Sequence, residues 1–134
     1  MMITIPGPPV GKGRPRFVRA TGHTYTPEKT RAYEAMVRQV YRLGRHGDPL
    51  QGPVCLEIMA VFPLPKDKRR RSALAGQPYT GKPDIDNVIK VIQDALNGLA
   101  YADDKQVTEL HAALRYCGEG EQPHVSVIIE EAKP

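Results

Sequence analysis

The side chains best suited to chemistry are carboxylates between positions 84 and 104. Asp84 and Asp86 follow a proline, and a second pair, Asp103-Asp104, comes seventeen or eighteen residues after Asp86. Proline favours extended backbone in its neighbourhood, and alternate side chains of an extended segment point the same way. Asp84 and Asp86 are therefore predicted to share a face. Lys90 lies about one helical turn beyond Asp86, on nearly the same side of the helix.

This pattern suits the hydrolysis of phosphodiester bonds. Carboxylate oxygens are the usual protein ligands of Mg²⁺, which keeps several waters and substrate phosphates in its shell. Metal ions held in this way supply an activated water and stabilise the leaving oxygen. A neighbouring lysine balances charge on the scissile phosphate or orients the water. The sequence thus predicts a divalent-metal site, with the carboxylates as ligands and Lys90 beside them.

Each of these residues also has an ordinary structural interpretation, which stays open. Asp84 or Asp86 can cap a helix, where its charge interacts favourably with the helix dipole. Asp86 and Lys90 can form a simple i,i+4 ion pair, and Asp103-Asp104 can be a turn. A loose PD…(D/E)xK nuclease pattern through Pro83-Asp84 and Asp103-Asp104-Lys105 is interpreted as accidental, because a helix is expected where that fold requires a hairpin.

Charge is divided unevenly along the chain. Residues 1–82 hold 15 of the 19 Lys and Arg and 5 of the 15 Asp and Glu, a net +10, whereas residues 83–134 carry a net −6. Such asymmetry indicates a polyanionic partner, although a solvated surface is the alternative. The side chains predicted to grip a DNA backbone are Lys12, Arg14, Arg16, Lys66, Lys68, Arg69, Arg70, Arg71 and Lys82. For Arg69–Arg71, facing solvent is the alternative.

The predicted elements form one domain over residues 1–134, whose length and 40% apolar content suit a single core. Thr26 is predicted to cap a helix that ends at Gly44, with Pro27 at its first position. Spacing typical of a helix predicts an apolar stripe on it, made of Tyr33, Met36, Val37, Val40 and Tyr41. Asp86 is predicted to cap a second helix, residues 86–98. Apolar alternation predicts strands at 2–6, 53–62, 106–116 and 123–130. A brief strand at 17–19, a short helix at 67–75 and a Gly/Pro-rich loop at 6–16 complete the pattern.

Other motifs carry weaker signals. His23, His46, His111 and His124 lack metal-ligand spacing, and Cys55 is expected in the core rather than as a nucleophile. Two cysteines do not make a disulfide framework, which favours a reduced, cytoplasmic setting. The glycine-rich loop lacks the Gly-Lys-Ser/Thr of a nucleotide-binding loop, so no nucleotide cofactor is expected. No signal peptide or membrane anchor is expected either.

Over nearly its whole length the chain resembles the RusA family of Holliday junction resolvases, in particular its phage-associated branch. Three segments carry most of the likeness: Lys-Pro-Asp84-Ile-Asp86-Asn87-Val-Ile-Lys90, Asp94-Ala-Leu-Asn-Gly and Asp103-Asp104-Lys-Gln106-Val107. The opening Ile-Pro-Gly-Pro-Pro-Val-Gly-Lys12-Gly-Arg14-Pro-Arg16-Phe17 and the helix entry Tyr25-Thr-Pro27 add to it.

The resemblance implies an α/β (α+β) fold, with a small mixed sheet of four to five strands, two main helices packed on it, and a homodimer. It implies a Mg²⁺-dependent endodeoxyribonuclease, with Mn²⁺ as a substitute, that resolves four-way junctions in recombination and repair. Asp84, Asp86, Lys90 and Asp104 take the catalytic roles, and Asp103 joins the three aspartates around the metal. The setting is a bacterial or phage-infected cell. A non-catalytic DNA-binding module, or a nuclease for flaps or forks, stays as the alternative.

Overall fold

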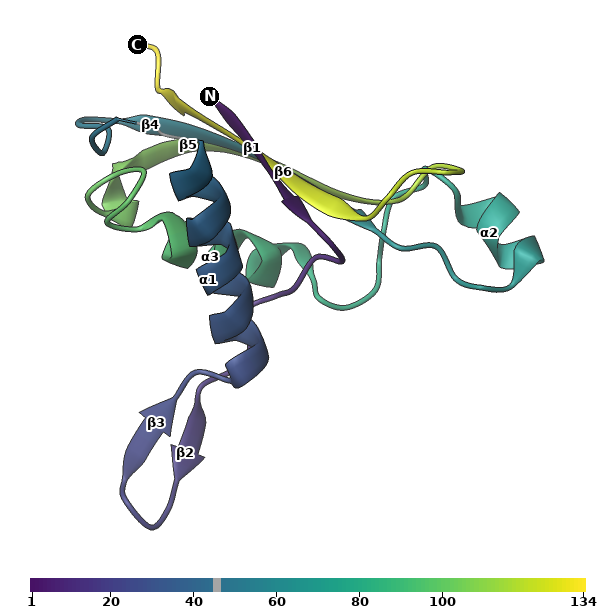
Figure 1. The fold of residues 1–134 in the computed structure, drawn as a ribbon, viewed down its shortest axis with the longest axis horizontal. Coiled ribbons are helices and arrows are strands. Elements are labelled where there is room, and N and C mark those ends of the chain that lie inside the picture. Colours follow the sequence, from purple (N-terminus) through teal and green to yellow (C-terminus); the bar gives the residue numbers. More distant parts are fainter. Residues whose placement is uncertain (45–46) are drawn as a thin grey trace.

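The computed structural model describes residues 1–44 and 47–134, and its centre is a mixed four-stranded sheet (Figure 1). The strands are β1 (Met2–Pro6), β4 (Val54–Phe62), β5 (Val107–Tyr116) and β6 (His124–Glu131), in the order β1-β6-β4-β5. β6 runs antiparallel to both β1 and β4, whereas β5 pairs parallel to β4 at the edge. The predicted α+β class and strand number are confirmed.

The core lies between one face of this sheet and the helices α1 (Glu28–Leu43) and α3 (Ile85–Leu96), which lie on the same side (Figure 1). On β4, Leu56, Ile58 and Ala60 are buried, as the predicted alternation requires. The residues between them point to the opposite face, where Glu57 is exposed. The sheet therefore has one face in the core and a second face that carries polar side chains.

α1 begins and ends close to the predicted positions. Its apolar stripe is confirmed, with Tyr33, Val37 and Tyr41 buried. The predicted cap by Thr26 is wrong: Pro27 occupies the N-cap position without a side-chain hydrogen bond, so the helix starts one residue later than expected. Gly44 closes the helix through its backbone N–H, as expected.

α3 differs from the prediction at both ends. It starts at Ile85 rather than at residue 86, and Asp84, not Asp86, is its N-cap. The extended backbone after the proline ends at Asp84, two residues earlier than expected, so Asp86 lies within the first helical turn and the prediction that the two aspartates share the face of one extended segment is wrong. The helix ends before Asn97, and Gly98, with φ of +79°, belongs to the turn that follows.

Two small elements project from this body (Figure 1). An arm is formed by β2 (Arg16–Val18) and β3 (His23–Tyr25), which pair only with each other among the described strands. The short helix α2 (Lys68–Leu74) confirms the helix expected at residues 67–75 and buries none of its residues. Among the described residues, no helix combines the length and apolar character needed to cross a bilayer.

Candidate functional site

Asp84 and Asp86 stand at the start of α3. The Asn87 backbone N–H and side-chain amide both donate to Asp84 Oδ1, at 3.2 and 2.8 Å. These bonds satisfy donors that every helix start leaves free, and they fix the Asp84 carboxylate in position. Both aspartates are exposed. Asp84 Oδ2 and the Asp86 carboxylate are therefore directed at solvent near the positive end of the helix dipole.

The glycine-rich loop packs directly on this helix start. The Lys12 backbone N–H donates to Asn87 O at 2.9 Å, and a Cβ at Gly11 would collide with the Pro83 side chain. Gly13 N–H donates to Thr30 Oγ1 at 3.0 Å, which ties the loop to α1 as well. Only a glycine at position 11 allows this close approach, so the loop is part of the frame that holds α3.

Lys12 is held between the two helices by carboxylates. Its Nζ lies 3.0 Å from Glu34 Oε2 on α1 and 2.9 Å from Asp94 Oδ2 on α3, and its side chain is 16% exposed. Burial acts to lower the pKa of the Lys12 ammonium, but the hydrogen bonds that it donates to Asp94 and Glu34 and the charges of these carboxylates outweigh this effect, and the net pKa is raised. Lys12, predicted to touch DNA, thus has two carboxylate partners within the protein.

Asp104 is the half-buried acid of the group. Its Oδ1 is buried and has no hydrogen-bond partner. Burial raises the pKa of the Asp104 carboxyl, and the Asp94 and Asp103 charges add to this rise, while a hydrogen bond from Tyr101 to the carboxylate and the charge of Lys90 oppose it. A buried carboxylate oxygen without a partner costs free energy. A bound cation would satisfy this oxygen, so the residue fits a metal-binding role.

Asp103 and Asp104 are positioned by a residue that sequence analysis did not single out. Gln106 Oε1 accepts from the backbone N–H groups of Ala102 and Asp103, at 2.8 and 2.9 Å. Its Nε2 donates to Leu50 O and Gly52 O, at 2.8 and 2.9 Å. The amide of Gln106 thereby joins the acidic turn, a 3₁₀ helix at Asp104–Gln106, to the segment before β4. The spacing of Gln106 three residues after Asp103 is that of a capping box, and this pattern could have indicated its role from the sequence.

Among the described residues the predicted acids do not form one cluster of ligand atoms: Asp84 and Asp86 lie at the start of α3, whereas Asp104 interacts with Asp94, near its end. Asp86 and Asp94 are about 12 Å apart along the helix axis, given its rise per residue. Asp104 and Asp94 interact with each other, and Lys90, between the two ends, interacts with Asp104. Asp103 Oδ1 accepts from Lys105 N–H at 2.9 Å and caps the 3₁₀ helix. Asp94 was not among the predicted site residues, although it lies one turn beyond Lys90.

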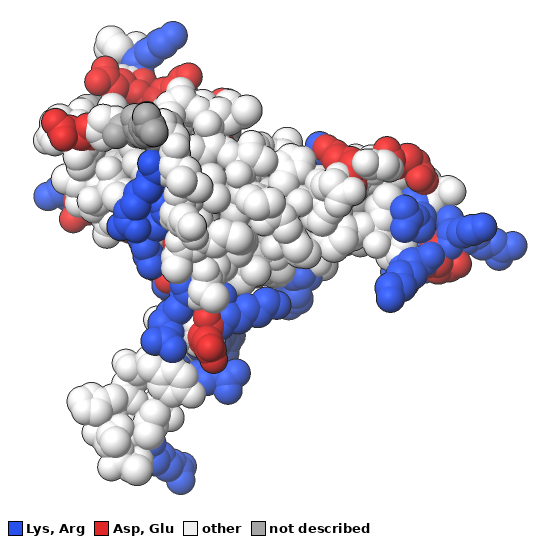
Figure 2. Space-filling model, in the orientation of Figure 1, with Lys and Arg blue, Asp and Glu red and all other residues white. Residues whose placement is uncertain are grey.

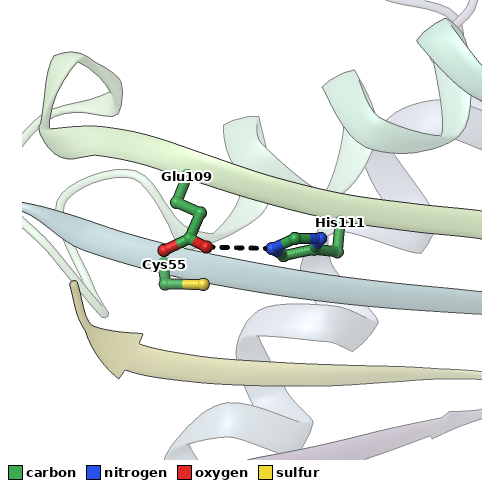
Figure 3. Close-up of side chains that lie close together, drawn as sticks. All are labelled: Cys55, Glu109 and His111. Atoms are coloured by element: carbon green, nitrogen blue, oxygen red, sulfur yellow. Dashed lines mark hydrogen bonds and ion pairs between the residues drawn. The ribbon is translucent and has the colours of Figure 1, made fainter. Parts of the chain in front are cut away.

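A different group of metal-capable side chains lies on the other face of the sheet. Within residues 1–44 and 47–134, one set of three His, Cys, Asp or Glu residues has ligand atoms within 4.8 Å of one another: Cys55, Glu109 and His111 (Figure 3). The expectation that Cys55 lies in the core is wrong, because alternation along β4 turns it away from the helices. His46 lies outside the described residues.

Apart from Lys12, the predicted DNA contacts fall into two regions of the surface, where Figure 2 shows blue patches. Arg14 and Arg16 lie where the arm joins the body, and Lys82 is exposed next to Pro83. The second region is α2 and the segment before it. There, Lys66, Lys68 and Arg71 line a shallow depression together with Ser72 and Glu119. Arg69 and Arg70, on the same helix, are exposed.

The chain shares its family signature with known proteins. The family model described as "Endodeoxyribonuclease RusA" matches residues 6–130. The chain is also 36% identical, over 138 aligned positions, to a protein of Bacillus subtilis (strain 168) described as "Uncharacterized protein YqaN". That alignment covers 96% of this chain and 94% of the relative. The matched span includes the glycine-rich loop, α3 and the acidic turn, and the chain belongs to the RusA family of endodeoxyribonucleases.

Proposed function

We propose that the protein is a metal-dependent endodeoxyribonuclease that nicks branched DNA, with four-way junctions as the preferred substrate. The observation that carries this proposal is the buried, unpartnered carboxylate oxygen of Asp104 beside Asp94 and Lys90. In a nuclease family, a carboxylate kept at a cost in stability is explained by a ligand that only the working enzyme binds.

In this proposal Asp84, Asp86 and Asp104 hold the metal, and Asp103 assists. Bound Mg²⁺, or Mn²⁺ in its place, would supply Lewis acidity and lower the pKa of a coordinated water. Lys90 balances negative charge on the scissile phosphate or orients the attacking water. Asn87 keeps Asp84 in place through the two hydrogen bonds to its Oδ1.

DNA binding is assigned to the exposed cations on either side of this site. Arg14 and Arg16 at the arm, Lys82 beside Pro83, and the α2 region Lys66–Arg71 offer positive charge to phosphates. Phe17, 62% exposed on the arm, places an aromatic ring next to these cations. Because Lys12 is already paired with Glu34 and Asp94, we assign it to holding the site together rather than to gripping DNA.

A homodimer fits this substrate. A four-way junction has approximate two-fold symmetry, and its resolution requires two matched nicks. One chain carries one acidic site, so a C2 pair of chains is the simplest assembly that delivers both nicks. We place this activity in recombination and repair, in the cytoplasm of a bacterial or phage-infected cell.

The test is a cleavage panel with a four-way junction, a fork, a flap and a linear duplex, each with and without Mg²⁺. We expect symmetric nicks in the junction that require the metal. Asp84→Asn should bind the junction as tightly as the wild type yet nick it at least about 100-fold more slowly, because it loses a metal ligand. Asp48→Asn, which removes an exposed acid outside the site, is the matched control.

A normal nicking rate in Asp84→Asn would contradict the assignment of Asp84 as a metal ligand. Nicking confined to forks or flaps would show that these structures, and not four-way junctions, are the substrate. A second candidate function is a non-catalytic DNA-binding module. The N-cap role of Asp84 and the pairing of Asp94 with Lys12 favour it, since both give the acids structural roles. It predicts junction binding that falls steeply with salt and no metal-dependent cleavage of any substrate.

A further inference from the structure

The group Cys55, Glu109 and His111 lies on the sheet face that points away from α1 and α3 (Figure 3). In the parallel pairing of β4 and β5, Cys55 is opposite Glu109, and Glu57 is opposite His111. Cys55 and Glu57 are two residues apart on one strand, as are Glu109 and His111 on the other. All four side chains therefore share one face, and the donor atoms converge because of strand register.

The donor atoms are already close to the spacing that a tetrahedral metal needs. Glu109 Oε1 lies 3.0 Å from His111 Nε2, and the thiol sulfur lies within 4.8 Å of a carboxylate oxygen of Glu109 and of a ring nitrogen of His111. Zinc–ligand bonds of about 2.0–2.3 Å in a tetrahedron separate neighbouring ligand atoms by about 3.3–3.8 Å. The side chains of Glu109 and His111 are more than half exposed, so small rotations can bring the three atoms to that spacing.

The surroundings favour a cation. A depression at this end of the sheet is lined by Cys55, Glu57, Glu109, His111, Glu130, Glu131 and Lys133. Four of these residues are acidic and one is a lysine, so the local potential is negative when His111 is neutral. These carboxylates attract a divalent ion, and a bound divalent ion stabilises the Cys55 thiolate.

We propose that Cys55, Glu109 and His111 form a binding site for a thiophilic divalent transition metal of the Zn²⁺ class. Sulfur, imidazole nitrogen and one carboxylate oxygen are the donors that Zn²⁺ accepts, whereas Mg²⁺ prefers oxygen alone. On binding, the thiol proton is released to solvent and the sulfur–metal bond forms, with no change of oxidation state. The fourth position is open to water or to Glu130, which pairs opposite Cys55 on β6.

The consequence is a link between β4 and β5. β5 is an edge strand joined to the sheet through β4, and the metal would tie the start of one strand to the start of the other. The ligands lie on the face opposite α3, so this site is separate from the proposed nuclease centre. The inference therefore stands or falls independently of the nuclease assignment.

The experiment uses Co²⁺ as the probe, because a cobalt–thiolate bond produces a charge-transfer absorption that carboxylate and imidazole ligands do not. The metal-free, reduced full-length protein is titrated with Co²⁺, and Zn²⁺ is then added. We expect a thiolate band that saturates at one Co²⁺ per chain and disappears on addition of Zn²⁺, with no effect from Mg²⁺. We also expect Zn²⁺ to raise the Tm.

The two cysteines provide matched variants. Cys55→Ser should lose the thiolate band and bind Zn²⁺ at least about 100-fold more weakly, since even residues behind the ligands cost 10–100-fold in such sites. Cys117→Ser, which alters the buried cysteine, should keep the band. His111→Gln, at an exposed position, should weaken Zn²⁺ binding while leaving the metal-free Tm unchanged.

Three results would overturn the proposal. They are the absence of a thiolate band at equimolar Co²⁺, retention of the band in Cys55→Ser, and unchanged Zn²⁺ affinity in His111→Gln. Circular dichroism spectra verify that each variant is folded. Because the readouts are absorption, affinity and Tm, the experiment tests the metal site whether or not the protein is a nuclease.

Discussion

The acidic group around α3 and the Cys55 group on the open sheet face differ in how they are supported. The acids are braced by side chains from several elements: Lys12 joins α1 to α3, and Gln106 joins the acidic turn to the segment before β4. The Cys55 group depends almost wholly on the pairing of β4 with β5. The difference implies that distant substitutions can disturb the acidic group without affecting the other group.

The largest effect is expected for Asp104→Asn. Nicking of a four-way junction should fall at least about 100-fold, because a proposed metal ligand is lost. The metal-free protein should be as stable as the wild type or more so, since the charge of a partly buried carboxylate with an unpartnered Oδ1 atom is removed. Nicking rates and the free energy of unfolding in urea measure the two effects. A large loss of stability would contradict the role assigned to the Asp104 Oδ1 atom.

The stability of the wild type relative to Asp104→Asn should change with pH in a defined direction. The pKa of Asp104 is raised in the folded protein, so its contribution to stability is present at low pH and is lost as the pH rises through the folded pKa. In metal-free conditions the wild type should lose stability relative to Asp104→Asn as the pH increases from about 4 to 7. Unfolding curves collected across that range would measure the trend, and a trend of opposite sign would contradict it.

The next effect is expected for Lys12→Met. It leaves Glu34, which is 8% exposed, without its ammonium partner and should lower the free energy of unfolding by about 1–3 kcal/mol. Nicking should also fall, because the ion-paired bridge from α1 through Lys12 to Asp94 on α3 is lost, while cobalt binding at Cys55 stays unchanged. Lys12→Arg keeps the charge and serves as the control. Equal losses of nicking and of cobalt binding would indicate global unfolding, and would contradict the separate support of the two groups.

A smaller effect is expected for Gln106→Ala, which removes the four hydrogen bonds that the Gln106 side chain makes at the acidic turn. We expect a loss of about 1–2 kcal/mol in unfolding free energy and a reduced nicking rate with unchanged junction affinity. Gln106→Glu keeps acceptors but loses the donors to Leu50 O and Gly52 O, so it should fall near the alanine variant in stability. A wild-type nicking rate in Gln106→Ala would contradict the role of Gln106 in positioning the acidic turn.

The smallest effect concerns the far end of β5, where Arg115 binds Glu121. The guanidinium nitrogens lie 2.6 and 2.9 Å from the carboxylate, which lowers the pKa of Glu121 to about 2. This pair contributes stability above the ordinary pKa of Glu, near 4.5, and the contribution is lost as the pH falls towards 2. Because the pair is partly exposed, Glu121→Gln should cost only about 0.5–1 kcal/mol at pH 7.

Glu121→Gln should also reduce the acid-induced loss of stability between about pH 4.5 and 2, as thermal melts at several pH values would show. Cobalt binding at the other end of β5 should be unaffected, if β5 holds its register along its whole length. Weaker cobalt binding in this variant would show that the strand responds as a unit.

Much of the architecture could be predicted from local pattern. The alternation in β4 and the apolar stripe of α1 predicted the correct buried faces, because burial of one face imposes the period of each element. The exact starts of α1 and α3 were predicted wrongly. Proline and aspartate are acceptable at more than one position around a helix start, and tertiary contacts such as Gly11 against Pro83 select among them.

The sequence by itself determined the acidic pattern and the family. Asp84, Asp86 and Lys90 lie within two helical turns of one another, so their relative positions depend on local spacing alone. Only the tertiary structure decided that Lys12 is paired with Glu34 and Asp94, and that Cys55 meets Glu109 and His111. These partners are at least 22 residues apart in the chain. Their contact depends on helix packing and strand register, which arise from the whole core rather than from any local segment.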